Sequence, residues 1–304
     1  MKTKENKGGN EIFVSLPPST KTAIELKNIT KRFGHVIANS DVSLKVQAGT
    51  IHGIVGENGA GKSTLMNILF GLYKPDSGKI LLNDHLVDVN SPEKSIALGI
   101  GMVHQHFMLV PTFTVLENVM LGNEGSILLK SGQESVLERL KYLSKTYGLE
   151  VDFEAVISDI PVGMQQRVEI LKALNRGAKI LILDEPTTGL DPQTRQIIWN
   201  KLKALKKNGT TILLTTHFME EAEKLCDNIS IIDNGEIKVS GNPQLLISEN
   251  LPKYILETTN VETISFFERN SKLYDKKIKN YINTYFLNDL GVTNDLKDMQ
   301  GTII

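Results

Sequence analysis

The amino-acid sequence predicts an α/β fold with a mainly parallel sheet at its centre. Two stretches, "KILIL" at 179–183 and "TTILLTT" at 210–216, are almost continuously apolar, as strands buried on both faces are. A helical pattern separates them, and a glycine-rich turn at 56–61 follows a third apolar stretch, "TIHGIV" at 50–55. Such alternation of strands and helices is typical of a layered α/β domain, because helices cover the faces of a parallel sheet.

The first strands of the chain show a different pattern. "AIELKNI" at 23–29 and "DVSLKV" at 41–46 alternate apolar and polar residues, as half-exposed antiparallel strands do. They predict an antiparallel β subdomain beside the parallel core. The helix expected after the glycine-rich turn covers about 62–70 and ends at Gly71, since glycine readily takes the left-handed conformation of a helix terminus.

Short signals mark the later elements. A residue whose side chain can cap a helix, followed by proline in the first turn, predicts a helix start, and so does Thr with Glu three residues later. An Asn-Gly pair predicts the turn of a β-hairpin. The signals are Ser91-Pro92, Thr114 with Glu117, and Asp191-Pro192 for helices, and Asn234-Gly235 for the hairpin. The stretch 133–175 reads as rich in helix, and we expect it to form a helical subdomain.

The two ends of the chain differ from the middle. Residues 1–21 are rich in Lys, Asn, Gly and Pro and predict a disordered tail, so the main domain is expected to cover 22–246. For 247–304 the sequence predicts a small helical appendage, either packed on the main domain or serving as a partner-docking or dimerising element. Apolar residues recur there at helical spacing, namely Tyr274, Ile278, Tyr281, Ile282 and Tyr285.

The composition narrows the function classes. With 304 residues, 40% hydrophobic and 23% charged, the chain resembles an ordinary soluble globular protein. Thirty-four basic against thirty-five acidic residues argue against a nucleic-acid binder. The single cysteine, Cys226, excludes an intramolecular disulfide. No apolar run approaches the length of a membrane span and the N-terminus lacks a signal-peptide core, so any membrane role is expected to be peripheral.

The segment "GENGAGKST" matches the P-loop pattern G-x-x-x-x-G-K-[ST] and lies between a strand and a helix, where the mechanism needs it. Its glycines let backbone N–H groups turn toward phosphate oxygens, and the lysine adds a full positive charge. Ser63 is placed to bind Mg²⁺, while Thr64 can reach an inner phosphate. The nine residues are Gly56, Glu57, Asn58, Gly59, Ala60, Gly61, Lys62, Ser63 and Thr64.

Two adjacent carboxylates follow the buried stretch "KILIL". Ligands bind at the carboxyl ends of strands in open α/β sheets, so Asp184 and Glu185 are expected at the nucleotide. Asp184 can hold the Mg²⁺ shell, and Glu185 can polarise the attacking water. A metal site on His104 and His106 is not expected, because no further Cys or His lies close to them in sequence.

Residues from about 23 to 246 resemble the nucleotide-binding subunits of ATP-binding-cassette (ABC) transporters in motif order and spacing. The resemblance implies a P-loop NTPase of the ABC type. It also implies that Phe33 stacks on adenine, that Gln105 senses Mg²⁺ and the membrane subunit, that Asp191 is the D-loop aspartate and that His217 is the switch histidine.

The segment "IPVGMQQR" stands where this family carries its signature, commonly Leu-Ser-Gly-Gly-Gln. In the family this segment covers the nucleotide bound to a partner cassette. Val162, Gly163 and Gln165 are expected to do so here, but the signature serine is replaced by Pro161, which offers neither a hydroxyl nor an N–H. Either this loss slows hydrolysis, or the helix dipole and the Gly163 backbone suffice.

The resemblance further implies ATP and Mg²⁺ as cofactors, transmembrane permease subunits and a second cassette as partners, and a place on the cytoplasmic face of the cell membrane. The second cassette can be identical or different, and an importer would add a substrate-binding protein. "GENGAGKSTLMNILFGLYKPDSGKI" and "VGMQQRVEILKAL" are most similar to nucleoside and simple-sugar importers, which usually fuse two cassettes. "LDEPTTGLDPQT" and "TTILLTTHFMEEAEKLCD" are more similar to single-cassette exporters. Import is slightly favoured.

Other classes fit less well. Repair and chromosome ATPases of this type insert a long coiled coil between P-loop and signature, and the interval between Lys62 and Pro161 is too short for one. Translation factors pair two cassettes through a basic linker, and neither feature is found in this sequence. Small GTPases need Asn-Lys-x-Asp, which is absent. A degenerate or regulatory cassette that binds ATP but hydrolyses it poorly, as half of a heterodimer, remains the alternative because of Pro161.

Overall fold

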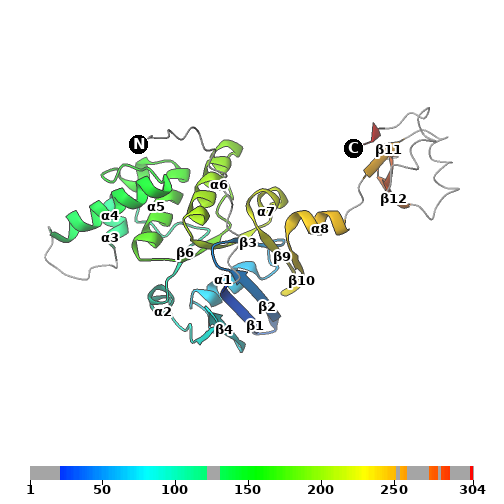
Figure 1. Ribbon diagram of the computed structural model, residues 1–304, viewed down its shortest axis with the longest axis horizontal. Helices are drawn as coiled ribbons and strands as arrows, with labels where there is room; N and C mark the ends of the chain where they lie inside the picture. The colour runs from blue at the N-terminus through cyan, green and yellow to red at the C-terminus, as the bar shows by residue number, and fades with distance from the viewer. Residues whose placement is uncertain are drawn as a thin grey trace, which may run out of the picture. The chain divides into compact units, whose positions relative to one another are not determined.

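The computed structural model describes residues 21–121 and 131–250 together with four short strands nearer the C-terminus (Figure 1). The chain divides into two units, Met1–Ser240 and Gly241–Ile304. The predicted disordered tail lies almost wholly outside the described residues.

A six-stranded sheet with the order β10-β9-β3-β8-β7-β6 forms the centre of the first unit. The neighbours from β9 to β6 run parallel, and every residue of β3, β7 and β8 is buried. The predicted parallel core is therefore confirmed. The strands are β3 (Ile51–Val55), β6 (Ile100–Val103), β7 (Ile180–Asp184), β8 (Thr211–Thr216), β9 (Asn228–Asp233) and β10 (Glu236–Gly241).

A second sheet, with the order β2-β1-β4-β5, is antiparallel, as the alternating pattern predicts. Helix α1 contacts both β2 and β7, and one hydrophobic core joins the antiparallel sheet, α1 and the parallel strands (Figure 1). The α1 helix is thus fixed from both sides. The elements are α1 (Lys62–Leu69), β1 (Thr22–Phe33), β2 (Val36–Gln47), β4 (Ser77–Leu82) and β5 (His85–Val87).

The helices begin at the predicted caps. Ser91 accepts from the Lys94 amide at the start of α2, and Thr114 forms a complete capping box with Glu117 at the start of α3. These helices, with α4, the short 3₁₀ turn η1 and α5, follow β5 in the chain and make up the helix-rich part. The elements are α2 (Pro92–Ala97), α3 (Val115–Met120), α4 (Ser131–Tyr147), η1 (Ile157–Asp159) and α5 (Val162–Asn175).

Two further helices follow β7 and β8, two strands of the parallel sheet. Helix α6 (Pro192–Lys207) begins at Asp191, and α7 (Met219–Leu225) follows β8 after a short turn. The β9–β10 hairpin turns on Asn234 and Gly235, which both have positive φ, 49° and 77°. Among the described residues, none of the helices combines the length and the apolar character needed to cross a membrane.

The second unit differs from the sequence prediction. It begins with α8 (Pro243–Asn250), but β12 (Tyr274–Lys279) and β13 (Ile282–Leu287) occupy most of the stretch that the sequence assigned to one helix. With β11 (Tyr254–Thr258) and β14 (Thr302–Ile303) they form an antiparallel sheet, β12-β13-β11-β14. The predicted helix is therefore wrong there. Tyr and Ile favour strands at least as strongly as helices, so a short apolar stripe does not distinguish the two.

Candidate functional site

The P-loop follows β3 and ends where α1 begins, as the sequence predicts. Gly59 and Gly61 have φ values of 85° and 101°, in the left-handed region that favours glycine. A Cβ on Gly61 would overlap the carbonyl oxygen of Ala38 on β2, so no larger residue fits there. The antiparallel sheet therefore packs directly against the loop that would hold phosphate.

Lys62 is the first residue of α1, and only 4% of it is exposed. Its Nζ donates to the carbonyl oxygens of Gly56 at 2.8 Å and Glu57 at 3.0 Å, and it lies 3.3 Å from Oε1 of Glu185. These contacts place the ammonium inside the turn of the loop, where a phosphate would bind.

A cavity of about 370 Å³ opens at this loop, within the size range of small-ligand sites. Glu185 and Gln105 line this cavity together with the P-loop, although they come from segments far apart in sequence. Its lining residues are Val36, Ile37, Ala38, Asn58, Gly59, Gly61, Lys62, Ser63, Thr64, Gln105 and Glu185.

Asp184 ends β7, and its Oδ1 accepts hydrogen bonds from the hydroxyls of Thr215 at 2.6 Å and Ser63 at 3.2 Å. Hydroxyl and carboxylate oxygens are the ligands that Mg²⁺ prefers. The Ser63 and Asp184 pair therefore fits the predicted metal role. Thr215, from β8, orients both acidic residues, because its hydroxyl also accepts from the backbone N–H of Glu185 at 2.9 Å.

Glu185 adopts a left-handed backbone, with φ at 49°, which turns its side chain away from the course of the strand. Its carboxylate contacts Lys62, accepts from the Thr188 hydroxyl at 3.1 Å and lies 3.4 Å from Nδ1 of His217. Burial raises the pKa of Glu185, but Lys62, Thr188 and His217 together outweigh it and leave the pKa below its ordinary value. The group is an ionised base near neutral pH.

Phe33 lies at the end of β1 and is 44% exposed. Its ring meets that of Tyr73 edge to face at 5.2 Å, and Nζ of Lys31 lies 5.4 Å from its centroid. Phe33 is not among the residues that line the P-loop cavity, whereas Val36 and Ile37 from the next strand are. Adenine stacking on Phe33 stays a prediction.

The signature segment begins α5 without a side-chain cap. Pro161 is the N-cap residue, with φ at −59° and ψ at 153°, and its carbonyl accepts from Met164 and Gln165. Gln165 does not project freely, because its amide donates to the carbonyls of Ile157 at 3.3 Å and Ile160 at 3.1 Å. It holds the loop before the helix, a role that the sequence did not indicate.

Gly163 and Asp191 both contact the first turn of α6. A Cβ on Gly163 would lie 2.6 Å from the Thr194 methyl carbon, so the signature glycine packs against the first turn of α6. Asp191 caps that turn and accepts from the amides of Gln193 and Thr194, both at 3.0 Å. The Thr194 hydroxyl and these amides lower the pKa of Asp191. None of the signature residues lines the cavity of this chain's own P-loop.

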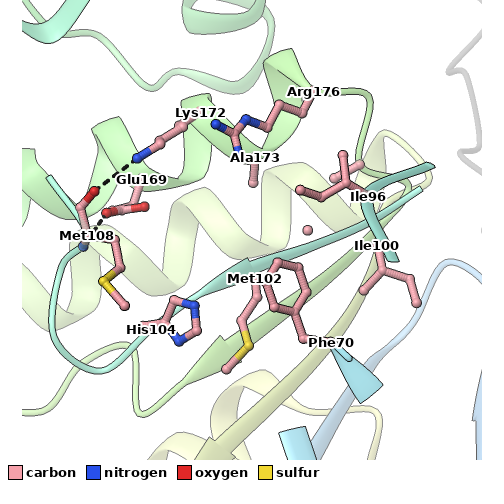
Figure 2. Close-up of a pocket in the computed structure, with 12 residues that line it drawn as sticks. Phe70, Ile96, Ile100, Met102, His104, Met108, Glu169, Lys172, Ala173 and Arg176 are labelled. Atoms are coloured by element: carbon pink, nitrogen blue, oxygen red, sulfur yellow. Dashed lines mark hydrogen bonds between the residues drawn. The ribbon is translucent and has the colours of Figure 1, made fainter. Parts of the chain in front are cut away.

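A second, smaller cavity of about 110 Å³ lies where β6 and α5 approach each other (Figure 2). His104 lines it one residue before Gln105, and Met108 beside it is 63% exposed. Glu169 accepts from the Met108 amide at 2.7 Å, and Lys172 donates to the Met108 carbonyl at 2.9 Å, so the loop after β6 is tied to α5. Burial raises the pKa of Glu169 and lowers that of Lys172.

These features define a class of protein. A glycine-rich loop opening a helix, a buried lysine and two acidic residues at the end of another strand of the same parallel sheet are the parts of a P-loop nucleotide-binding domain.

Comparison with known proteins narrows the class. Residues 39–188 match a family model described as ABC transporter. The nucleoside import ATP-binding protein NupA of Lactococcus lactis is 49% identical over 72% of this chain and 43% of its own length. The Nod factor export ATP-binding protein I of Cupriavidus metallidurans is 38% identical over 77% of this chain and 76% of its own length. The chain belongs to the ABC transporter ATP-binding proteins.

Solved structures agree with this assignment. An ATP-binding cassette of an ABC transporter in its ADP conformation is 27% identical, with a TM-score of 0.68 over 76% of this chain and 96% of that one. A dimeric cassette in a post-hydrolysis state, bound to ADP and Pi, is 31% identical, with a TM-score of 0.60 over 72% of this chain and 98% of that one. The chain spans less than half the length of the import relatives it matches.

Proposed function

We propose that this chain binds ATP with Mg²⁺, hydrolyses it and so drives a membrane transporter. The observation that carries the proposal is the meeting of Lys62, Ser63 and Glu185 at one cavity, with Asp184 hydrogen-bonded to Ser63. A phosphate-binding cation, a metal-binding pair and an ionised base are the groups that phosphoryl transfer to water needs.

Each residue has a distinct task in this mechanism. Lys62 and the backbone N–H groups of the P-loop bind the phosphates, and Lys62 then exchanges its contact with Glu185 for the γ-phosphate. Ser63 and Asp184 would hold Mg²⁺, with Gln105 beside them, and the ion would supply positive charge to the phosphate oxygens. Glu185 accepts the proton of the attacking water, and His217 beside it contacts the γ-phosphate.

The signature segment serves a partner cassette rather than this chain's own nucleotide. Its residues lie outside the lining of the P-loop cavity, and the positive end of the α5 dipole at Gly163 is available to an anion. Two cassettes related by a two-fold axis would each cover the other's ATP. The partner is a second copy or a different cassette.

We place the contact with the permease at the small cavity around Met108 (Figure 2). An exposed methionine adapts to an apolar partner, and the loop that bears it continues from Gln105, so movement at the nucleotide reaches this surface. A permease contact there would hold the chain at the cytoplasmic face of the membrane.

Import of a nucleoside or a simple sugar is favoured over export. The identity to the import relatives, 49%, exceeds that to the export relatives, 38%. Against this, the chain spans 76% of an export relative but only 43% of an import relative. Transport by vesicles containing the cognate permease, with label added inside or outside, decides the direction.

The test of ATP binding uses Lys62→Ala, with Lys207→Ala as a matched control, because Lys207 is an exposed lysine on α6. Calorimetry is expected to show that Lys62→Ala loses ATP binding and turnover, since no other Lys or Arg of the described residues lines the cavity, while Lys207→Ala keeps both. Equal ATP affinity in the two variants would contradict the proposed function.

A further inference from the structure

We propose that Phe218 and Arg195 are positioning residues that hold the imidazole ring of His217 in place beside Glu185. The proposal rests on the ATPase function proposed above, and it concerns two residues outside the sequence motifs. Phe218 follows His217 directly, whereas Arg195 comes from the first turn of α6, more than twenty residues earlier.

The three side chains form a stack. The rings of His217 and Phe218 have centroids 4.1 Å apart and are inclined at 40°. Cζ of Arg195 lies 4.2 Å from the Phe218 centroid, well inside the range of a cation–π contact. The ring of Phe218 therefore contacts both the guanidinium and the imidazole.

His217 needs such support because its polar contact is weak. Its side chain is 32% exposed, and among the described residues its polar contact is the 3.4 Å separation between Nδ1 and Oε1 of Glu185. Good hydrogen bonds between nitrogen and oxygen are shorter, from about 2.7 to 3.2 Å. The stack with Phe218 thus does more to orient the ring than the carboxylate does.

The backbones of Phe218 and Arg195 are themselves fixed by hydrogen bonds. The Phe218 amide donates to the Thr216 hydroxyl at 2.9 Å, at the end of β8, and the Arg195 amide donates to the Asp191 carbonyl at 2.9 Å. Nε of Arg195 is buried without a hydrogen-bond partner among the described residues. The ring of Phe218 is then the main contact of the guanidinium on this side, with Glu220 contributing at longer range.

The position of Arg195 links two functional segments. Thr194, its neighbour in the same turn, packs against the signature glycine Gly163. A shift of this turn would move the His217 stack and the signature segment together. The first turn of α6 therefore connects this chain's own hydrolytic site with the segment that covers the partner's ATP.

The first experiment compares steady-state ATP hydrolysis by Phe218→Ala, Phe218→Tyr and Arg195→Met. Misplacement of a reacting group by about 1 Å costs up to about a hundredfold in rate, so we expect kcat to fall about tenfold or more in Phe218→Ala and Arg195→Met. ATP affinity should change less than about twofold, because the P-loop is untouched, and Phe218→Tyr should keep the wild-type kcat. Met219→Ala, a change at an exposed neighbour, is the matched control.

A double-mutant cycle separates positioning from a general loss of structure. In a His217→Ala background, Phe218→Ala should cause little further loss of kcat, since the residue acts through the missing imidazole. An equal fold-loss in both backgrounds would overturn the proposal, as would unchanged kcat in Phe218→Ala and Arg195→Met.

Failure of this positioning proposal can be distinguished from failure of the proposed ATPase function. If the wild-type protein does not hydrolyse ATP, the ATPase proposal fails. The contact between Phe218 and His217 is then tested by the NMR signal of the His217 ring. That signal should move in Arg195→Met, where the ring of Phe218 remains but its clamp is gone, and should stay in Met219→Ala. An unmoved signal in Arg195→Met would refute the clamp.

Discussion

Pro161 stands where the resemblance to the family places the signature serine. As the N-cap of α5 it supplies a backbone carbonyl to the first turn but no side-chain acceptor and no N–H. The anion-binding capacity of this helix end rests on the dipole and the backbone around Gly163 alone.

We predict that Pro161→Ser raises the rate of ATP hydrolysis by about tenfold. A hydroxyl at this position would donate to the γ-phosphate, and a hydrogen bond to a charged group is worth about 1.5–3 kcal/mol. Serine would also add a cap to α5, worth about 0.5–2 kcal/mol of local stability. Turnover is measured for each protein alone and with a candidate partner cassette.

Each result of this comparison has a meaning. A rise only with the partner cassette would indicate a heterodimer in which this chain contributes an impaired signature. Equal rates for wild type and Pro161→Ser in every combination would show that the helix dipole already suffices and that the proline is neutral.

At the scale of elements, the P-loop is held by two segments distant in sequence. The hairpin residue Gly235 donates to the Ala60 carbonyl at 3.1 Å and accepts from the Ser40 amide at 2.9 Å. From β2, Asn39 donates to the Gly61 carbonyl at 3.2 Å. The loop is thus preorganised before any nucleotide binds, which reduces the ordering that binding requires.

This arrangement predicts different effects for two glycines of the same loop. Gly59→Ala places a Cβ in open space, so only the left-handed backbone is strained, at about 1–2 kcal/mol. Gly61→Ala adds an overlap with the backbone of Ala38 and should lower the free energy of unfolding further and abolish ATP binding. Denaturant unfolding without nucleotide, followed by calorimetry with ATP, measures both. Equal destabilisation by the two substitutions would contradict the packing of β2 on the loop.

At the scale of the whole molecule, the proposed site is incomplete in one chain. The P-loop cavity is lined by residues of the P-loop, the start of β2, Gln105 and Glu185, and the signature segment is not among them. In the proposed function, a second cassette would supply it. A dimeric relative of known structure, bound to ADP and Pi, is similar to this chain over 98% of its length.

We predict that Glu185→Gln forms a dimer in the presence of Mg-ATP. The substitution removes the base while keeping the shape of the side chain, so hydrolysis should slow by about 10²–10⁴-fold and ATP should persist between the cassettes. Sedimentation with and without Mg-ATP measures the change. The double variant Lys62→Ala, Glu185→Gln should stay monomeric because it cannot hold the nucleotide. A monomeric Glu185→Gln at high concentration, alone and with a candidate partner, would contradict the composite site.

The sequence by itself determined the features that contiguous residues encode. The P-loop, the buried strand before Asp184, the capping box at Thr114 and the turn at Asn234 each depend on chemistry within a few positions of the chain. The structure places each of them as predicted. The single cysteine, Cys226, is buried, and burial raises the pKa of its thiol.

Only the tertiary structure decided which distant residues meet. Thr215 orients Asp184 and Glu185, and Arg195 reaches Phe218. Both contacts depend on how separate elements pack. The segment from Tyr274 to Leu287 shows the same limit for secondary structure. Its apolar spacing suited a helix, but strand pairing with β11 sets the conformation, because a strand is stabilised by partners elsewhere in the chain.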